Sequence, residues 1–72
     1  MNKMLSVWHN ADDKPREGAM VAFVFNNDMY VGEVIHREDE EDTYFISYSG
    51  EAYYQSEITK WAYTEDILKA TY

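Results

Sequence analysis

The fold of this chain is decided by residues 19–37, Ala-Met-Val-Ala-Phe-Val-Phe-Asn-Asn-Asp-Met-Tyr-Val-Gly-Glu-Val-Ile-His-Arg. Two runs rich in β-branched and aromatic residues flank a cluster of Asn and Asp. Residues of the first kind fit a pleated, half-buried surface, whereas Asn and Asp tolerate the positive φ of a tight turn. The stretch therefore predicts a β-hairpin with strands over 19–25 and 29–37.

The register of this hairpin depends on which residues form the turn. A two-residue turn at Asn27-Asp28 is preferred, because it places an aromatic ring over a glycine. A three-residue turn would instead put Glu33 opposite Val21. The pairs expected from the preferred turn are Phe25 with Tyr30, Phe23 with Gly32 and Val21 with Val34.

Outside the hairpin, residues 43–49 predict a third strand and residues 57–63 a last strand. The third strand is expected to carry an apolar stripe of Tyr44, Ile46 and Tyr48. In the last strand, Thr59, Trp61 and Tyr63 are expected on one face, with Ile58 and Ala62 on the other.

A short helix is predicted from Thr64, because Glu65 and Asp66 suit the positive end of a helix dipole. Ile67 and Leu68 are expected to dock this helix on the sheet. The fold class is mainly β: a small antiparallel sheet, or an SH3-like curled barrel, of four to five strands with a short C-terminal helix. A chain of 72 residues is expected to form a single domain over residues 1–72.

Charge and composition narrow the functional classes. Fourteen acids against six bases give a net charge of −8, the wrong sign for neutralising nucleic-acid phosphates. Without Cys there is neither a disulfide nor a thiolate metal site. Seven Tyr, three Phe and two Trp supply a dense aromatic core, and aromatic residues are also favoured at interfaces. No apolar span is long enough to cross a membrane, so a cytoplasmic protein is expected.

Catalytic signatures are weak. His9 with Asp12 or Asp13, and His36 with Glu38, are the His–carboxylate pairs that lie close in sequence. Isolated His residues at loop edges are common without a chemical role, and no Gly-rich phosphate loop is present. We therefore expect neither an enzyme nor a bound metal or cofactor.

Two groups of residues are the candidates for binding. The first is the aromatic set Trp8, Trp61 and Tyr63, which offers rings for stacking. The second is a run of acids, called the acidic run, which resists packing and is expected to be a solvated loop. The acidic run consists of Glu38, Asp39, Glu40, Glu41 and Asp42.

Residues 8–68 contain a series of short sequence motifs that can be compared with those of known families. These motifs are Trp8-His9, Pro15, Gly18 ahead of Val21, Thr59-Lys60-Trp61-Ala62-Tyr63, and Glu65-Asp66-Ile67-Leu68. With them the chain resembles small uncharacterised proteins of gut bacteria and their phages. Those proteins open with Trp, Pro and Gly before a hairpin, and close on a Trp-Ala-Tyr-type segment. The resemblance implies a phage or mobile-element setting and no particular activity.

Three functions follow as hypotheses. The first is a small acidic, non-catalytic binding protein that occupies a basic surface of a host protein, including a host defence protein, without contacting nucleic acid or membrane. The second is a sponge that sequesters a nucleotide-like ligand between subunits, with Arg16, Arg37 or Lys60 contacting phosphates. The third is an accessory structural protein without a dedicated ligand. A homo-oligomer is compatible with each of them.

Overall fold

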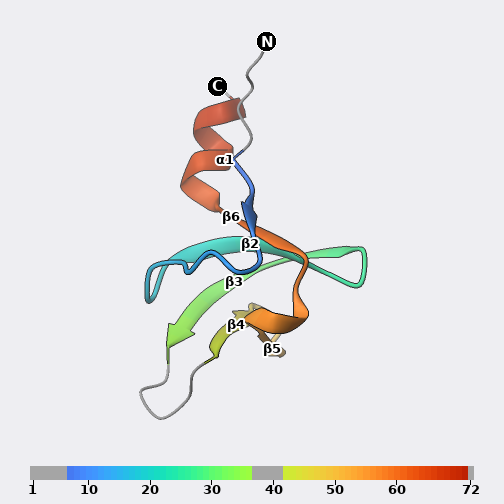
Figure 1. Ribbon diagram of the computed structural model, residues 1–72. Helices are drawn as coiled ribbons and strands as arrows, with labels where there is room; N and C mark the ends of the chain where they lie inside the picture. Colours follow the sequence, from blue (N-terminus) through green and yellow to red (C-terminus); the bar gives the residue numbers. More distant parts are fainter. Residues whose placement is uncertain (1–6, 37–41, 72) are drawn as a thin grey trace.

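The protein is described by a computed structural model over residues 7–36 and 42–71. Its described part is an antiparallel six-stranded sheet followed by one short helix (Figure 1). The strands are β1 (His9–Asn10), β2 (Met20–Phe25), β3 (Asp28–His36), β4 (Thr43–Ser47), β5 (Ala52–Tyr54) and β6 (Lys60–Tyr63). A 3₁₀ helix, η1 (Gln55–Glu57), joins β5 to β6, and α1 (Thr64–Thr71) follows.

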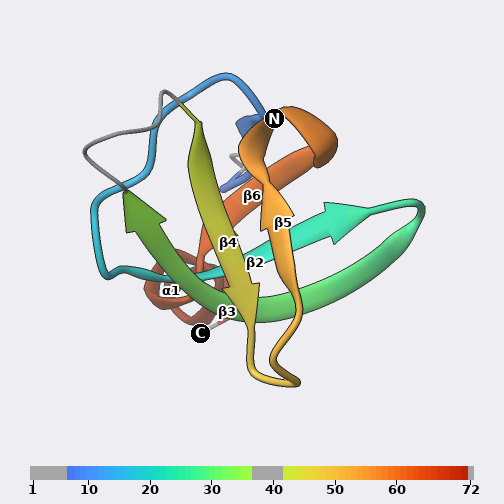
Figure 2. The ribbon, with the colours of Figure 1, turned by 90° about the horizontal axis from the view of Figure 1, so that it is seen from below.

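The predicted mainly β fold with a short C-terminal helix is confirmed. The strand order is β1-β6-β2-β3-β4-β5, so the sheet is open, with β1 and β5 as its edges. It is a curled sheet of six strands rather than a closed barrel of four or five. Figure 2 shows the curl, with β4 and β5 crossing over β2. No helix in the described ranges is long and apolar enough to cross a membrane.

The turn of the central hairpin differs from the predicted one. Asn26 and Asn27 form it, with φ of 54° and 68°, and Phe25 pairs with Asp28. Positive φ at both central residues is the requirement of a type I′ turn, which matches the twist of the flanking strands. The predicted turn at Asn27-Asp28 is therefore wrong. Asp tolerates positive φ as Asn does, so residue type alone left the two positions undecided.

The register error does not disturb the faces of the hairpin. Phe23 pairs with Tyr30, not Gly32, and Val21 pairs with Gly32, not Val34. Each partner is displaced by two residues, and side chains two apart share a face. The displacement therefore leaves Val21, Phe23 and Val34 on one face of the hairpin. The buried core cluster consists of Val21, Phe23, Val34, Phe45, Ile58 and Trp61.

Gly32 lies where β3 changes partners. β3 pairs with β2 from Asp28 to Glu33 and with β4 from Gly32 to His36, so Gly32 is the first residue with a strand on both sides. A Cβ at position 32 would overlap the carbonyl of Ile46 and the Cα of Ser47. Glycine therefore permits the close approach of β4 at the point where β3 curves (Figure 2).

Gly18 sets the entry into β2. Its N–H donates to the Val34 carbonyl at 2.8 Å, while the Val34 N–H donates to the Ala19 carbonyl at 3.0 Å. Two residues therefore stand opposite one, with Gly18 at φ 77°, which is the pattern of a glycine β-bulge. The bulge connects the sheet to the loop that carries Arg16.

The predicted apolar stripe of the third strand is wrong. The buried residues of β4 are Thr43, Phe45 and Ser47, whereas Tyr44 and Ile46 are half-buried and Tyr48 is exposed. Phe45 decides the face, because it pairs with the core residue Val34. The Ser47 hydroxyl lies 2.8 Å from that of Ser49 and accepts a bond from the Glu51 N–H, so its burial leaves no polar group unpaired.

The last strand is shorter than predicted. Residues 55–57 form η1, so β6 begins at Lys60 and strand alternation does not extend back to Ile58. Ile58 consequently joins the core with Trp61 instead of sharing a face with Ala62.

The helix begins at Thr64 as predicted, and it contacts β2 and β6. Its docking differs from the prediction, because Leu68 is 56% exposed. The sequence also favours a short edge strand over residues 4–8, most of which lie outside the described residues. The first described strand, β1, begins at His9.

Candidate binding surface

Trp61 belongs to the core. Its side chain is 1% exposed, and it pairs across the sheet with Phe23. The His9 ring stacks on it at 4.2 Å between centroids, and its indole N–H donates to the Asp13 carbonyl at 3.0 Å. Of the predicted aromatic set, Trp61 therefore presents no ring face to a ligand.

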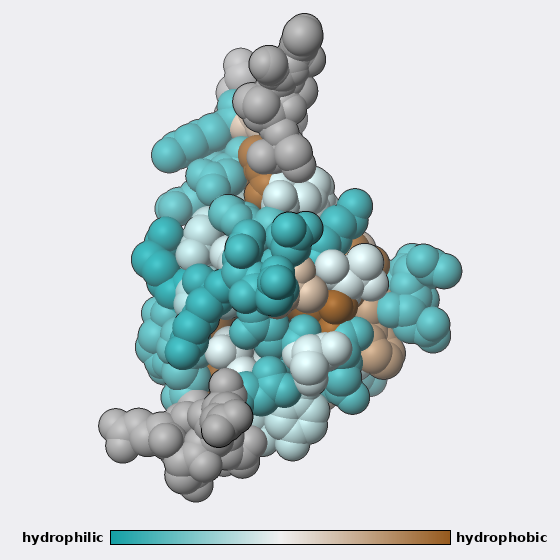
Figure 3. Space-filling view, viewed as in Figure 1, coloured by the Kyte–Doolittle hydropathy of each residue, from teal (hydrophilic) through white to brown (hydrophobic). Residues whose placement is uncertain are grey.

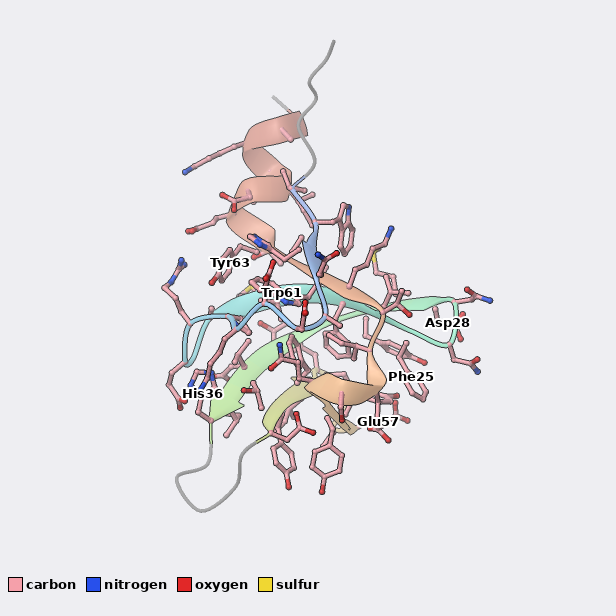
Figure 4. All side chains as sticks on the ribbon, viewed as in Figure 1. Phe25, Asp28, His36, Glu57, Trp61 and Tyr63 are labelled. Atoms are coloured by element: carbon pink, nitrogen blue, oxygen red, sulfur yellow. The ribbon has the colours of Figure 1, made fainter. Side chains whose placement is uncertain are left out.

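Tyr63 lies beside Trp61 at 4.8 Å and is half-buried (Figure 4). The Arg16 guanidinium lies 4.2 Å from the Tyr63 ring centroid, and the same guanidinium donates to Glu65 at 3.2 Å. The Tyr63 hydroxyl accepts a bond from the Arg16 backbone N–H at 3.0 Å. We call His9, Arg16, Trp61, Tyr63 and Glu65 the ring–arginine cluster.

Trp8 is also in contact with a cation of the chain. The Lys60 ammonium lies 5.0 Å from the Trp8 ring centroid. Lys60 is next to Trp61 in β6, so the two side chains leave opposite faces of the sheet. Together with the ring–arginine cluster, this contact occupies rings and cations that the nucleotide hypothesis assigned to a ligand.

Both histidines have carboxylate neighbours. His9 Nδ1 lies 3.6 Å from Asp13, as the first predicted pair allowed. His36 Nδ1 lies 3.3 Å from Glu17, and the His36 backbone N–H donates to the same carboxylate at 2.8 Å. Glu38, its predicted neighbour, lies outside the described residues. Within 7–36 and 42–71, no group of three or more His, Asp or Glu could hold a metal ion.

Four members of the acidic run, residues 38–41, also lie outside the described part. Asp42 is described, and its carboxylate accepts bonds from the Thr43 N–H at 3.0 Å and the Ser56 hydroxyl at 2.8 Å. Asp42 therefore ties the start of β4 to η1, a structural role within a run expected to be solvated. A cavity of about 370 Å³ lies beside it, lined by Ala11, Asp12, Asp42, Gln55 and Ser56.

A different group of residues gathers around the edge strand β5. Tyr48 is 65% exposed and Tyr54 is 41% exposed. The Tyr53 hydroxyl donates to Glu51 at 2.7 Å, and the Tyr54 backbone N–H donates to Glu57 at 3.0 Å. Each of two adjacent tyrosines in β5 is thus bonded to a carboxylate. We call Tyr48, Glu51, Tyr53, Tyr54 and Glu57 the tyrosine–acid edge.

Tyr53 links this edge to the core. Its ring centroid lies 4.7 Å from that of Phe25 and 5.2 Å from that of Tyr30. The hydrogen bond to Glu51, together with burial, raises the pKa of Tyr53 well above its usual range. Tyr53 therefore stays protonated and continues to orient the Glu51 carboxylate through the neutral pH range.

Positive charge is distributed unevenly between the ring–arginine cluster and the tyrosine–acid edge. From Ala19 to Thr59 the chain has a single Lys or Arg, Arg37, which lies outside the described residues. The described bases are elsewhere: Lys14, Arg16, Lys60 and Lys69. In Figure 4, Glu57 lies on η1, well apart from Tyr63 and Trp61. The described part of the tyrosine–acid edge thus carries aromatic rings and carboxylates without a Lys or Arg of its own.

Exposed apolar side chains of β3 lie on the outer face, the face of the sheet opposite the core, and Val31 adjoins Tyr48 of this edge. Met29 is 63% exposed and Val31 is 38% exposed, and the Tyr48 N–H donates to the Val31 carbonyl at 3.1 Å. The side of the molecule seen in Figure 3 is mostly hydrophilic, with small separate apolar areas. Exposed Tyr and Met are enriched at protein contact surfaces.

The sequence reasoning placed Glu51 and Glu57 with the acidic run as a possible contact face, and it did not select the tyrosines of the tyrosine–acid edge. Residues 52–56 fit a turn, a strand or a helical turn, so neither Tyr53 nor Tyr54 had a predicted face. The available signal was the density of Tyr and Glu over 48–57 and the lack of Lys and Arg there.

Searches against protein-family models, curated proteins and solved structures found no match to this chain.

Proposed function

We propose that this chain is a non-catalytic binding protein that occupies a basic surface of another protein through the tyrosine–acid edge. One observation carries the proposal. The described cations Arg16 and Lys60 lie on rings elsewhere in the molecule, while the exposed rings and carboxylates around β5 have no described Lys or Arg beside them. A partner protein with exposed Lys or Arg side chains would place cations beside these rings and carboxylates.

The side chains suit such an interface. Tyr provides a large contact area with few rotatable bonds, so ordering it on binding costs little entropy. Tyr48 and Val31 are exposed and joined by a backbone hydrogen bond, so they add apolar contact area to the carboxylates of the edge. Opposite charge on the partner would accelerate association and make binding sensitive to salt. The resemblance to phage and gut-bacterial proteins adds the setting of a host protein as the partner.

An NMR titration tests this proposal. The ¹⁵N-labelled protein is titrated with a decapeptide of alternating Gly and Lys or Arg, at low and at physiological salt, with a Gly-Ser peptide as control. The largest shift changes with the basic peptide should fall on the amides of Glu51, Tyr53, Tyr54 and Glu57. Binding should weaken with salt, because exposed charges are screened within about 8 Å at 0.15 M.

Two variants of equal charge locate the surface. Glu51→Gln/Glu57→Gln removes two charges from the tyrosine–acid edge, and Glu40→Gln/Glu41→Gln removes two from the acidic run. We expect the first to weaken peptide binding about tenfold, or ~1.4 kcal/mol, and the second to have a smaller effect. Equal losses would show that net charge alone drives binding, and absence of binding at low salt would overturn the proposed function.

A further inference from the structure

The ring–arginine cluster contains a complete example of how this fold holds an arginine. The Arg16 guanidinium lies over the Tyr63 ring at 4.2 Å and is bonded to the Glu65 carboxylate at 3.2 Å. The ring and the carboxylate come from positions two residues apart. One planar cation therefore makes both contacts, because a guanidinium can stack through its face and donate through its edge.

The tyrosine–acid edge also has a tyrosine ring and a glutamate carboxylate close together, but no described cation lies on them. Tyr54 is 41% exposed, and its backbone N–H donates to one carboxylate oxygen of Glu57 at 3.0 Å. That bond holds the carboxylate beside β5, and no described group is bonded to its second oxygen. The Tyr44 hydroxyl donates to the Tyr54 hydroxyl at 3.2 Å, and the two ring centroids are 4.7 Å apart, which fixes the Tyr54 ring.

We propose that Tyr54 and Glu57 bind an arginine side chain of the partner, with its guanidinium stacked on the Tyr54 ring and bonded to Glu57. This inference rests on the proposed function and names the side chain that the edge selects. Lysine fits less well, because its ammonium is a compact, strongly hydrated charge that cannot stack and donate in this way. Arginine at a bidentate or stacked site is not replaced by lysine without loss.

Charge disfavours a second copy of this chain as the source of that arginine. Arg16, the one arginine among the described residues, is already engaged with Tyr63 and Glu65 within its own chain. Two copies, each with a net charge of −8, would also repel each other. The complementary occupant is therefore an Arg-bearing surface of a different, basic protein.

The test compares two peptides that differ only in the cation, Gly-Ser-Arg repeated three times and Gly-Ser-Lys repeated three times. Both are titrated into the ¹⁵N-labelled protein at low salt. The arginine peptide should bind about tenfold more tightly, with the largest shift changes at Tyr54 and Glu57. Tyr54→Phe should keep this preference, since the ring remains, whereas Tyr54→Leu and Glu57→Gln should remove most of it.

Tyr48→Leu is the matched control, because Tyr48 is an exposed ring of the same edge with no recorded bond to a carboxylate. It should leave the preference for arginine unchanged. The dispersion of the amide spectrum verifies that each variant is folded. Equal affinity for the two peptides, with shifts still at the edge, would overturn the arginine inference and leave the proposed function standing. Binding of neither peptide would instead overturn the proposed function.

Discussion

The ring–arginine cluster and the tyrosine–acid edge each contain a tyrosine close to a glutamate, and they differ in whether a cation of the chain lies on that pair. In the cluster, Arg16 comes from a loop that lies 47 positions before the tyrosine it contacts. At the edge, Tyr54 and Glu57 are close in sequence and joined by a hydrogen bond, and no described cation of the chain lies on them. Composition alone therefore does not distinguish an aromatic residue that stabilises the fold from one that is available to a partner.

The strongest test of this difference is the removal of one ring from each region. Trp61→Ala should lower the free energy of unfolding by about 3–5 kcal/mol, because it empties a fully buried site. That loss is a large fraction of the stability of a small domain. Tyr54→Ala should change it by less than about 1 kcal/mol. Denaturant unfolding followed by far-ultraviolet circular dichroism measures both, and similar losses would contradict the division into core and contact rings.

The close approach of β4 to β3, the strand between the two regions' strands β6 and β5 in the sheet order, can be tested at Gly32. Gly32→Ala should cost about 3 kcal/mol, since the atoms in the way are backbone atoms of β4 that cannot rotate aside. Gly50→Ala is the matched control, because nothing lies within 4 Å of a Cβ there and only its φ of 95° is strained. It should cost about 1 kcal/mol. Thermal unfolding of both variants would show whether the close approach of β4 is the dominant constraint.

A smaller effect is expected from the cation of the ring–arginine cluster. Arg16→Ala should destabilise the protein by about 0.5–1 kcal/mol, because the ion pair with Glu65 is solvent-exposed and screened. Lys14→Ala, in the same loop, should have no measurable effect. The difference between the variants should shrink in high salt. An Arg16→Ala protein as stable as the Lys14→Ala protein would show that the Tyr63–Arg16 contact contributes nothing.

The smallest effect concerns pH. The pKa of Tyr53 is raised in the folded state, so the unfolded state loses this proton first as pH rises. The stabilisation is fully present below about pH 10, the ordinary pKa of Tyr, and is lost above it. Absorbance titration of tyrosinate should show Tyr53 ionising after the other tyrosines. Glu51→Gln should bring it closer to them, and an unchanged titration would contradict the role of the Glu51 carboxylate.

Sequence patterns located the strands of this protein better than their exact pairing. The predicted pairs already grouped Val21, Phe23 and Val34 on one face of the hairpin, and that grouping survives a displacement of the register by two residues. The register itself depended on whether Asp28 or Asn26 joined Asn27 in the turn, and both residue types suit such a turn. In β4 the buried face was misassigned, because Thr43 and Ser47 are buried only through the local bonds and neighbours that the fold provides.

The candidate surface was less accessible to prediction than the fold. Trp61, Tyr63 and Trp8 were selected for their ring chemistry, yet the contacts that engage them come from distant positions, such as Arg16 and His9. Tyr54 and Glu57 are close in sequence, but their pairing depends on the 3₁₀ helix that follows β5. A sequence shows which groups are present, and the fold determines which of them are already satisfied.

The pairing of β1 with β6 has a consequence for how the protein is made. These are the first and last described strands, and Trp61 also donates a hydrogen bond back to Asp13, 48 positions earlier. On a ribosome adding roughly 5–20 residues per second, the core cannot close until Trp61 has emerged. Contacts so distant in sequence also slow folding. A nascent chain that stalls before this point keeps Val21 and Phe23 uncovered, so we expect it to be degraded instead of persisting as a shortened binder.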